Sequence, residues 1–221
     1  MRPLQRITHL LRQAWLSLTM QSSADYWERR YRLGMTSGPG STGELARFKA
    51  DFLNGFVREQ GVQTVIEFGC GDGTQLALAE YPGYVGVDVS AAAIELCRTR
   101  FAGDATKTFR LQQNGETGGL REVADLALSL DVIYHLLEDD VYAAYLDQLF
   151  RAAKRWVIVY SSNREETVRA RHVRHRPFVD DVLRRHPQFE LARKVDNPRP
   201  AESFADFYVF RRVSPSTTSR A

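Results

Sequence analysis

The sequence has little of three features that would each point to a particular class of protein. It contains two cysteines, Cys70 and Cys97, which are too few for a framework of several disulfides or for a zinc cluster. It has no run of the roughly 20 apolar residues that a membrane-spanning helix needs. Its net charge of +3 over 221 residues does not by itself call for a nucleic-acid partner. Together these absences predict a cytoplasmic protein with no membrane span and no structural metal.

The composition suits one globular domain, because 43% of the residues are hydrophobic and 26% are charged. Residues 1–19 repeat apolar side chains at helical spacing, with arginines at other positions, which predicts an amphipathic helix. That helix would pack on the domain or on a second subunit, or make peripheral contact with a membrane surface. We expect a monomer or homodimer. Three segments are predicted: an N-terminal helical or lid segment at 1–43, the main domain at 44–213 and a disordered tail at 214–221.

From residue 64 onward, short apolar runs alternate with helical patterns. This alternation predicts a doubly wound α/β fold, in which parallel strands are joined by right-handed crossovers and helices cover both faces. Two final runs, with no helix between them, predict a hairpin at the edge of the sheet. The expected strands are 64–68, 84–89, 108–112, 124–130, 155–161, 189–196 and 204–213. The expected helices are about 44–59, 74–80, 90–101, 139–153 and 177–186.

A glycine-rich loop follows the first of these strands. Gly69, Gly71 and Gly73 would let the main chain lie directly against a ligand. Asp88 ends the next strand, about twenty residues past Glu67, where a carboxylate can accept hydrogen bonds from both hydroxyls of a ribose. Nicotinamide cofactors use a different glycine spacing, and the carboxylate of Glu67 would repel their pyrophosphate but attract a cation. The loop therefore predicts a site for a positively charged nucleoside.

These residues resemble the class I S-adenosylmethionine-dependent methyltransferases. "VIEFGCGDG" looks like the first motif of that family, "YVGVDVS" like the second and "ADLALSLDVIYHL" like the fourth, in the expected order. The resemblance covers about residues 60–160. More loosely, the segment from "DYWERRY" to "ELARFK" is similar to bacterial members whose acceptors are mostly unassigned, some of them tied to surface-glycan or secondary-metabolite pathways. The resemblance implies S-adenosylmethionine as cofactor and a seven-stranded Rossmann-like sheet of order 3-2-1-4-5-7-6 with the last strand antiparallel.

The resemblance also implies roles for individual residues. Glu67 would orient the methionine amino group, Asp88 would hold the ribose, and Asp131 would face the methionine part and the acceptor. Gln113 or Asn114 would meet the adenine, because "FRLQQNGE" lacks the acid that many members place there. Gly69, Gly71 and Val89 would supply further cofactor contacts, and Tyr31 is expected to reach the cofactor from the aromatic segment before the core.

The acceptor end is less defined. Methyl transfer from a sulfonium mainly requires alignment, and only a poorly acidic acceptor such as an alcohol needs a base. The candidate bases are Asp131, His135, His172 and His175. The segment 163–178 is rich in arginine, which predicts either a solvated helix face or a site for an anionic acceptor. The residues expected to form that anion site are Tyr160, Arg171, Arg174 and Arg176.

The aromatic residues Tyr26, Trp27 and Tyr31 precede a loop with glycines at 38, 40 and 43, so this segment is expected either to cover the cofactor as a lid or to pack as a helix on the sheet. We predict methyl transfer to a small-molecule or glycan acceptor, at oxygen and on an anionic substrate. Two alternatives are N-methylation of RNA or protein and a non-catalytic cofactor-binding subunit. RNA is disfavoured because no RNA-binding module is appended and few aromatics accompany the basic cluster.

Overall fold

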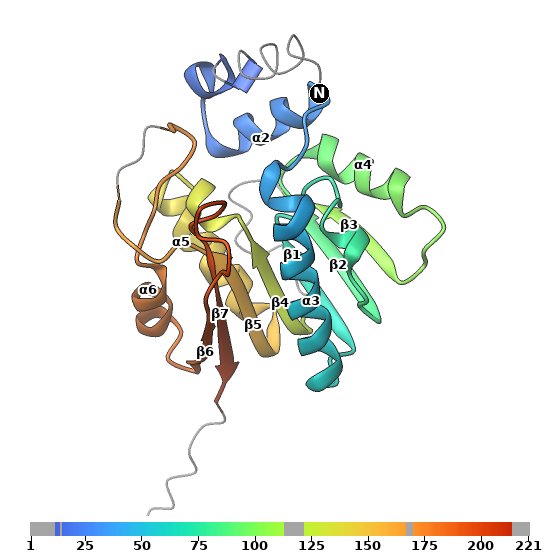
Figure 1. Ribbon diagram of the computed structural model, residues 1–221, viewed down its shortest axis with the longest axis vertical. Helices are drawn as coiled ribbons and strands as arrows, with labels where there is room; N and C mark the ends of the chain where they lie inside the picture. Colours follow the sequence, from blue (N-terminus) through green and yellow to red (C-terminus); the bar gives the residue numbers. More distant parts are fainter. Residues whose placement is uncertain (1–11, 14, 113–121, 167–169, 214–221) are drawn as a thin grey trace, which may run out of the picture.

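The computed structural model describes residues 12–13, 15–112, 122–166 and 170–213. Within them, seven strands form one sheet of order β3-β2-β1-β4-β5-β7-β6, in which only the pairs that include β7 are antiparallel (Figure 1). The predicted strand order and terminal hairpin are confirmed. The strands are β1 (Thr64–Phe68), β2 (Gly83–Asp88), β3 (Lys107–Leu111), β4 (Ala124–Leu130), β5 (Ala153–Ser161), β6 (Phe189–Val195) and β7 (Asp206–Arg212).

Helices cover both faces of the sheet, so the central strands are apolar on both sides. Val65 of β1 belongs to the same hydrophobic cluster as residues of α3 and α4, while Ile66 and Phe68 belong to the cluster formed with α5 and α6. This alternation explains why the strand sequences are nearly continuous apolar runs. The helices are α2 (Ser23–Arg32), α3 (Gly43–Glu59), α4 (Ala91–Arg100), α5 (Asp139–Arg151) and α6 (Phe178–Arg185).

The prediction of a helix at about 74–80 is wrong, because the segment forms only a 3-10 turn, η2 (Leu76–Leu78). The side chain of Asn54 in α3 donates to the carbonyl oxygen of Leu78 and accepts from the amide of Glu80, at 2.9 Å each. These bonds hold the segment against α3 in a non-helical course. Pro82 then disfavours helical angles at the preceding residue.

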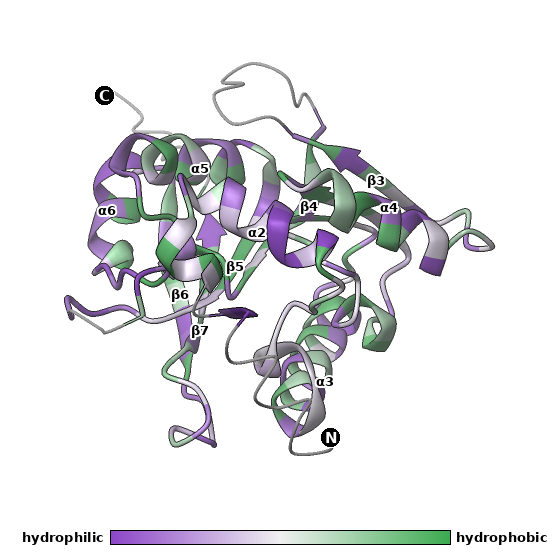
Figure 2. Cartoon of the chain, turned by 90° about the horizontal axis from the view of Figure 1, so that it is seen from above, coloured by the Kyte–Doolittle hydropathy of each residue, from purple (hydrophilic) through white to green (hydrophobic). Residues whose placement is uncertain are grey.

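The N-terminal segment crosses the end of the sheet where the parallel strands terminate. Figure 1 shows α2 at the top of the molecule, and Figure 2 shows it from above, crossing the sheet between α5 and α4. Leu16, Tyr26 and Met35 form a small hydrophobic cluster of their own. The amphipathic helix predicted for residues 1–19 lies mostly outside the described residues, as does the predicted tail. No described helix is long and apolar enough to cross a membrane.

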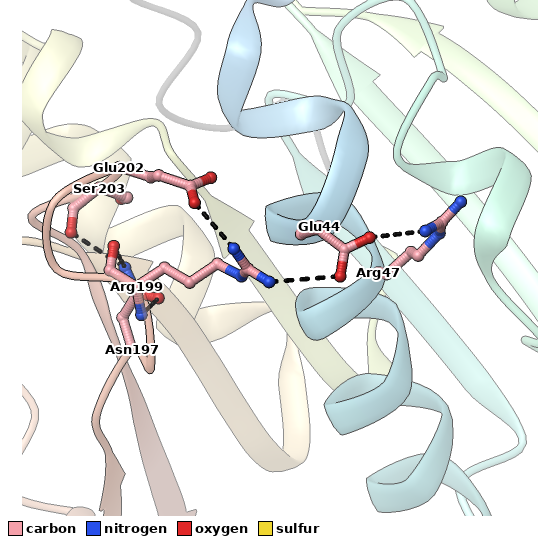
Figure 3. A network of polar contacts seen from close by, with 6 residues as sticks. All are labelled: Glu44, Arg47, Asn197, Arg199, Glu202 and Ser203. Carbon is pink, nitrogen blue, oxygen red and sulfur yellow. Dashed lines mark hydrogen bonds and ion pairs between the residues drawn. The ribbon is translucent and has the colours of Figure 1, made fainter.

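The loop between β6 and β7 is fastened to the start of α3. Arg199 pairs with Glu44 of α3 at 3.4 Å and with Glu202 of its own loop at 2.9 Å (Figure 3). Asn197 donates to the carbonyl oxygens of Arg199 and Ser203 at 3.2 and 2.9 Å. The Ser203 hydroxyl in turn accepts from Tyr160, so this loop packs at the end of β5.

Candidate functional site

The glycine loop after β1 requires residues without a Cβ for two reasons. Gly69, Gly71 and Gly73 have φ of 79°, 58° and 72°, which residues with a Cβ rarely adopt. A Cβ on Gly69 would also lie 2.4 Å from Val132, and one on Gly71 would lie 2.5 Å from the hydroxyl of Ser37. The loop is therefore pressed between the segment after β4 and the N-terminal segment.

One cysteine, Cys70, belongs to this loop, and the other, Cys97 of α4, lies against it. The Cys97 thiol donates to the carbonyl oxygen of Gly71 at 3.1 Å, and the Cys70 side chain contacts the same oxygen at 4.0 Å. Hydrogen bonding with Cys97, together with burial, raises the pKa of the Cys70 thiol well above its usual range. The Cys70 side chain is thus held as a neutral thiol.

A cavity of about 470 Å³ opens at the carboxyl ends of β1, β2 and β4, roofed by residues of α2 and of the segment that follows it. Its volume is in the range usual for small-molecule sites. The predicted residues Tyr31, Glu67, Gly69, Gly71, Asp88, Val89, Asp131 and His135 all line it.

Asp88 is buried at the end of β2, and its two oxygens accept hydrogen bonds from the amides of Gly71 and Ser90 at 2.9 Å each. These bonds fix the carboxylate beside the glycine loop. Burial raises its pKa to about 6, although the backbone amides oppose that shift. The remaining lone pairs suit the two hydroxyl groups of a ribose.

Glu67 is buried deeper, at the end of β1. Its Oε2 accepts a hydrogen bond from the hydroxyl of Tyr84 at 2.7 Å. Burial raises its pKa to about 7, while the bond from Tyr84 and the charge of Lys49 act in the opposite direction. A cationic ligand group beside Glu67 would lower that pKa again, so the site favours such a group.

Gln112, at the rim of the cavity, is not among the predicted cofactor-binding residues. Gln113 and Asn114 lie outside the described residues, but Gln112 lines the cavity and donates from its amide to the side chain of Gln148. Its backbone amide donates to the carbonyl oxygen of Asp88 at 2.9 Å. Gln112 was placed inside the predicted strand 108–112, whereas β3 ends at Leu111 and leaves it as the first residue of the rim.

Asp131, after β4, is the only described residue other than glycine with a positive φ, at 60°. Its Oδ2 pairs with the ammonium of Lys49 at 2.6 Å, and its Oδ1 accepts from the hydroxyl of Tyr134 at 2.7 Å. Its amide donates to the carbonyl oxygen of Tyr160. The unusual backbone angle is thus held from three sides.

His135 is the histidine that lines the cavity. Its Nδ1 lies 2.8 Å from the carbonyl oxygen of His172, which can only accept, so Nδ1 carries the proton and Nε2 carries the lone pair. Burial lowers the pKa of the ring to about 4, and the ring is neutral at pH 7. Trp27 of α2 packs edge-on against it, with ring centroids 4.9 Å apart.

Comparisons with known proteins agree with this geometry. Residues 66–156 match the family model described as a methyltransferase domain. The chain carries a class I S-adenosylmethionine-dependent methyltransferase domain. This confirms the family, enzyme class and cofactor expected from the motifs. No curated protein gives a significant match to the sequence.

Solved structures share the methyltransferase fold at low sequence identity. The N-methyltransferase NodS from Bradyrhizobium japonicum WM9, in complex with S-adenosylhomocysteine, is 16% identical with a TM-score of 0.66, over 88% of this chain and 100% of that one. Magnesium protoporphyrin IX methyltransferase (ChlM) from Synechocystis PCC 6803, with bound S-adenosylmethionine, is 16% identical with a TM-score of 0.65, over 88% and 99%. The methyltransferase domain of a bacterial Hen1 is 19% identical with a TM-score of 0.61, over 75% and 97%.

Two of the histidines proposed as bases lie outside the cavity lining of this methyltransferase domain. His172 is bonded to the hydroxyl of Ser17 at 2.9 Å and stacks on Tyr26 of α2. His175 is bonded to the hydroxyl of Ser162 at 2.6 Å. The ring of His172 packs the loop before α6 against the N-terminal segment, and the ring of His175 packs it against the residue that follows β5.

The prediction that arginines bind an anionic acceptor is corrected by the structure, because Arg174 and Arg176 bind groups of the protein itself. Arg176 donates to the carbonyl oxygens of Leu136 and Leu137 and pairs with Asp139, and Arg174 binds Leu137 and the same aspartate. Their guanidinium groups hold the segment that leads into α5, and they do not line the cavity. Arg171 and Tyr160 do not line it either. The structure therefore forms no anion site from these four residues at the cavity.

The predicted lid residues Trp27 and Tyr31 line the cavity, and hydrogen bonds hold their segment over it. Glu28 accepts from the hydroxyl of Ser90 at 2.6 Å, beside Asp88. The Ser37 amide and hydroxyl donate to Asp72 at 3.1 and 2.9 Å. The Ser23 hydroxyl donates to Glu138 at 2.6 Å, at the start of α5. The segment is thus fastened to the loops after β1, β2 and β4.

Proposed function

We propose that this cavity binds S-adenosylmethionine and that the protein methylates a hydroxyl group of a small-molecule or glycan acceptor. The observation that carries the proposal is the pair of buried carboxylates, Glu67 and Asp88, beside a bare glycine loop in one cavity. Asp88 would hold the ribose, Glu67 the amino group, and the backbone at Gly69 and Gly71 the rest of the nucleoside arm. The cofactor supplies a methyl group on an activated sulfonium, which leaves the protein mainly the task of alignment.

The adenine would lie between Val89 and Gln112. Val89 is 38% exposed although it lines the cavity, so its apolar surface is available to a flat base. The amide of Gln112 can donate to or accept from a base edge. Gln112 takes the role that the sequence analysis gave to Gln113 or Asn114.

Oxygen is favoured as the acceptor atom by the state of His135. Its neutral ring has a fixed tautomer with a lone pair on Nε2, which can take the proton of an acceptor hydroxyl. Trp27 and the stacked His172 hold the ring in place. Positioned proton acceptors contribute about 10²–10⁴-fold to the rate, and the lowered pKa makes His135 a weak base, toward the lower end of that range.

A small acceptor is favoured by the roof of the cavity. Because α2 and the Ser37 segment cover it, a small molecule or the end of a glycan fits better than the body of a folded RNA or protein. The anionic character first expected of the acceptor loses its support, since Arg174 and Arg176 bind protein groups. A negative charge on the acceptor is therefore not part of the proposal.

The test is transfer of an isotope-labelled methyl group to separated small-molecule, glycan, RNA and protein fractions of a cell extract. We expect label in the small-molecule or glycan fraction, with mass spectrometry showing a methyl ether. Label confined to RNA or protein would overturn the proposal. Binding of S-adenosylhomocysteine with no label in any fraction would identify a cofactor-binding subunit.

With the labelled acceptor in hand, His135→Gln should lower kcat by about 10²-fold, the lower end of the range for a positioned base. The affinity for S-adenosylhomocysteine, measured by calorimetry, should stay unchanged. His175→Gln is the matched control, because His175 lies outside the cavity lining, and we expect its kcat to stay near that of the wild type. Equal losses in both variants would remove His135 from the reaction.

A further inference from the structure

A lysine lies buried at the edge of the proposed cofactor site. Lys49 comes from α3, its side chain is 1% exposed, and it lines the cavity. Among the described residues of the lining, it is the only lysine or arginine. A buried ammonium in a ligand cavity needs a partner of opposite charge in every state of the site.

In the structure that partner is Asp131, whose Oδ2 lies 2.6 Å from the Lys49 nitrogen. The other oxygen of Asp131 accepts from Tyr134. The backbone of Gly40 lies close above Oδ2, since a Cβ built there would be 3.2 Å from it. Both oxygens of Asp131 are thus engaged by the protein, while this ion pair uses one of the three N–H donors of Lys49.

The charges of the cavity indicate what else Lys49 could bind. Four carboxylates line it, those of Glu67, Asp88, Asp131 and Asp140, and they suit the sulfonium and ammonium groups of S-adenosylmethionine. The same cofactor carries one negative group, the carboxylate of its methionine part. That group would be repelled by the four acids unless a cation received it.

We propose that Lys49 binds this carboxylate and that the ligand thereby replaces Asp131 as the partner of the ammonium. The inference rests on the proposed function, because it assumes that the cavity holds the cofactor. Asp131 then acts as a placeholder in the empty site. Its Oδ2 is released when the cofactor arrives, next to the position where the acceptor must lie.

The experiment compares two ligands by calorimetry. S-Adenosylhomocysteine is one, and 5′-deoxy-5′-(3-aminopropylthio)adenosine is the other, which keeps the nucleoside, the sulfur and the amine but lacks the carboxylate. We expect the wild type to prefer S-adenosylhomocysteine by about 10- to 100-fold, the usual size of a charge-assisted hydrogen bond. In Lys49→Met this preference should fall to near one, with the decarboxylated ligand still bound.

A second variant tests the exchange of partners. In Asp131→Asn the preference should be kept or increased, because Lys49 loses its competing partner, and asparagine tolerates the positive φ of this position. A preference that falls in Asp131→Asn as far as in Lys49→Met would overturn the exchange. A preference that survives in Lys49→Met, or in Lys49→Gln should the first variant not fold, would overturn the role of Lys49.

The matched control is Lys107→Met, which removes a lysine paired with Asp104 outside the cavity lining, and should leave the preference unchanged. Binding of the decarboxylated ligand reports an intact pocket in each variant. Should the wild type bind neither ligand, the proposed function fails, and that outcome is distinct from a failure of Lys49 alone.

Discussion

The two halves of the cavity are built in different ways. The cofactor half consists of a glycine loop and two strand-end carboxylates, Glu67 and Asp88, which follow one another closely in the sequence. The other half, called the acceptor half here, would receive the acceptor and the methionine end of the cofactor in our proposal, and it brings together Lys49 of α3, Asp131 after β4 and His135 of the 3-10 turn η3 (Ile133–His135). The spacing of glycines and strand ends in the sequence predicts the cofactor half. A contact between side chains of distant segments, such as that of Lys49 with Asp131, cannot be predicted from spacing.

The largest expected effect tests the cofactor half. Asp88→Ala should weaken S-adenosylhomocysteine by about 100-fold or more, because charge-assisted hydrogen bonds to the ribose are lost. Calorimetry measures the affinity, and Asp104→Ala, at an exposed turn, is the control. An unchanged affinity in Asp88→Ala would show that the strand-end carboxylate does not hold the ribose, and the comparison between the halves would collapse.

A pH series tests the same half through Glu67. The pKa of its carboxyl is raised to about 7, so the empty site gains a proton as the pH falls through that value. Binding a cationic amine requires the ionised form, and affinity should fall by up to about tenfold between pH 7 and 6, before the carboxyl of Asp88, with a pKa of about 6, also takes up a proton. Glu67→Gln should bind more weakly above pH 7 and lose most of this slope.

The same raised pKa has a consequence for the stability of the empty protein. The ordinary pKa of 4.5 applies to Glu67 in the unfolded chain, so between pH 4.5 and about 7 the folded state holds the extra proton. The contribution of Glu67 to the free energy of unfolding is therefore lost as the pH rises through this range. Thermal unfolding of wild type and Glu67→Gln across this range would measure it, and identical pH profiles would contradict the assignment.

A smaller effect is expected at the roof that joins the halves. Ser37→Ala removes the hydroxyl that donates to Asp72 and contacts Tyr31. We expect S-adenosylhomocysteine to dissociate several-fold faster in stopped-flow measurements, up to about tenfold. Thr106→Ala removes a similar bond to Asp104 on a distant turn and serves as the control. Equal rates in wild type and Ser37→Ala would mean that the segment does not retain the ligand.

The smallest effect is expected at the loop between β6 and β7, whose residues do not line the cavity. Arg199→Ala breaks two ion pairs between partners that are each at least 41% exposed, and it should lower the free energy of unfolding by less than about 1 kcal/mol in urea titrations. Affinity for S-adenosylhomocysteine should not change. A large rise in KM for the acceptor would show that this loop shapes the acceptor half.

The features that the sequence predicts divide in the same way. The runs 64–68 and 124–130 match β1 and β4 at both ends, because buried parallel strands are continuous apolar runs bounded by turns. Lys49 was missed, although it lies four residues after Leu45 and four before Leu53, on the buried face of α3. That spacing could have indicated that Lys49 is buried. No spacing could show that the donors of Arg174 and Arg176 are taken by carbonyl oxygens, since that depends on how the chain folds back.

The two cysteines can serve as native sites for chemical labelling of the cavity. Cys70 lines the cavity and Cys97 is fully buried, and both contact Gly71. A bound nucleoside would cover Cys70 in the cavity and hold the glycine loop against Cys97, so it should protect both thiols from an alkylating reagent. The rate of alkylation, followed by mass spectrometry, therefore monitors occupancy of the pocket without the introduction of a probe.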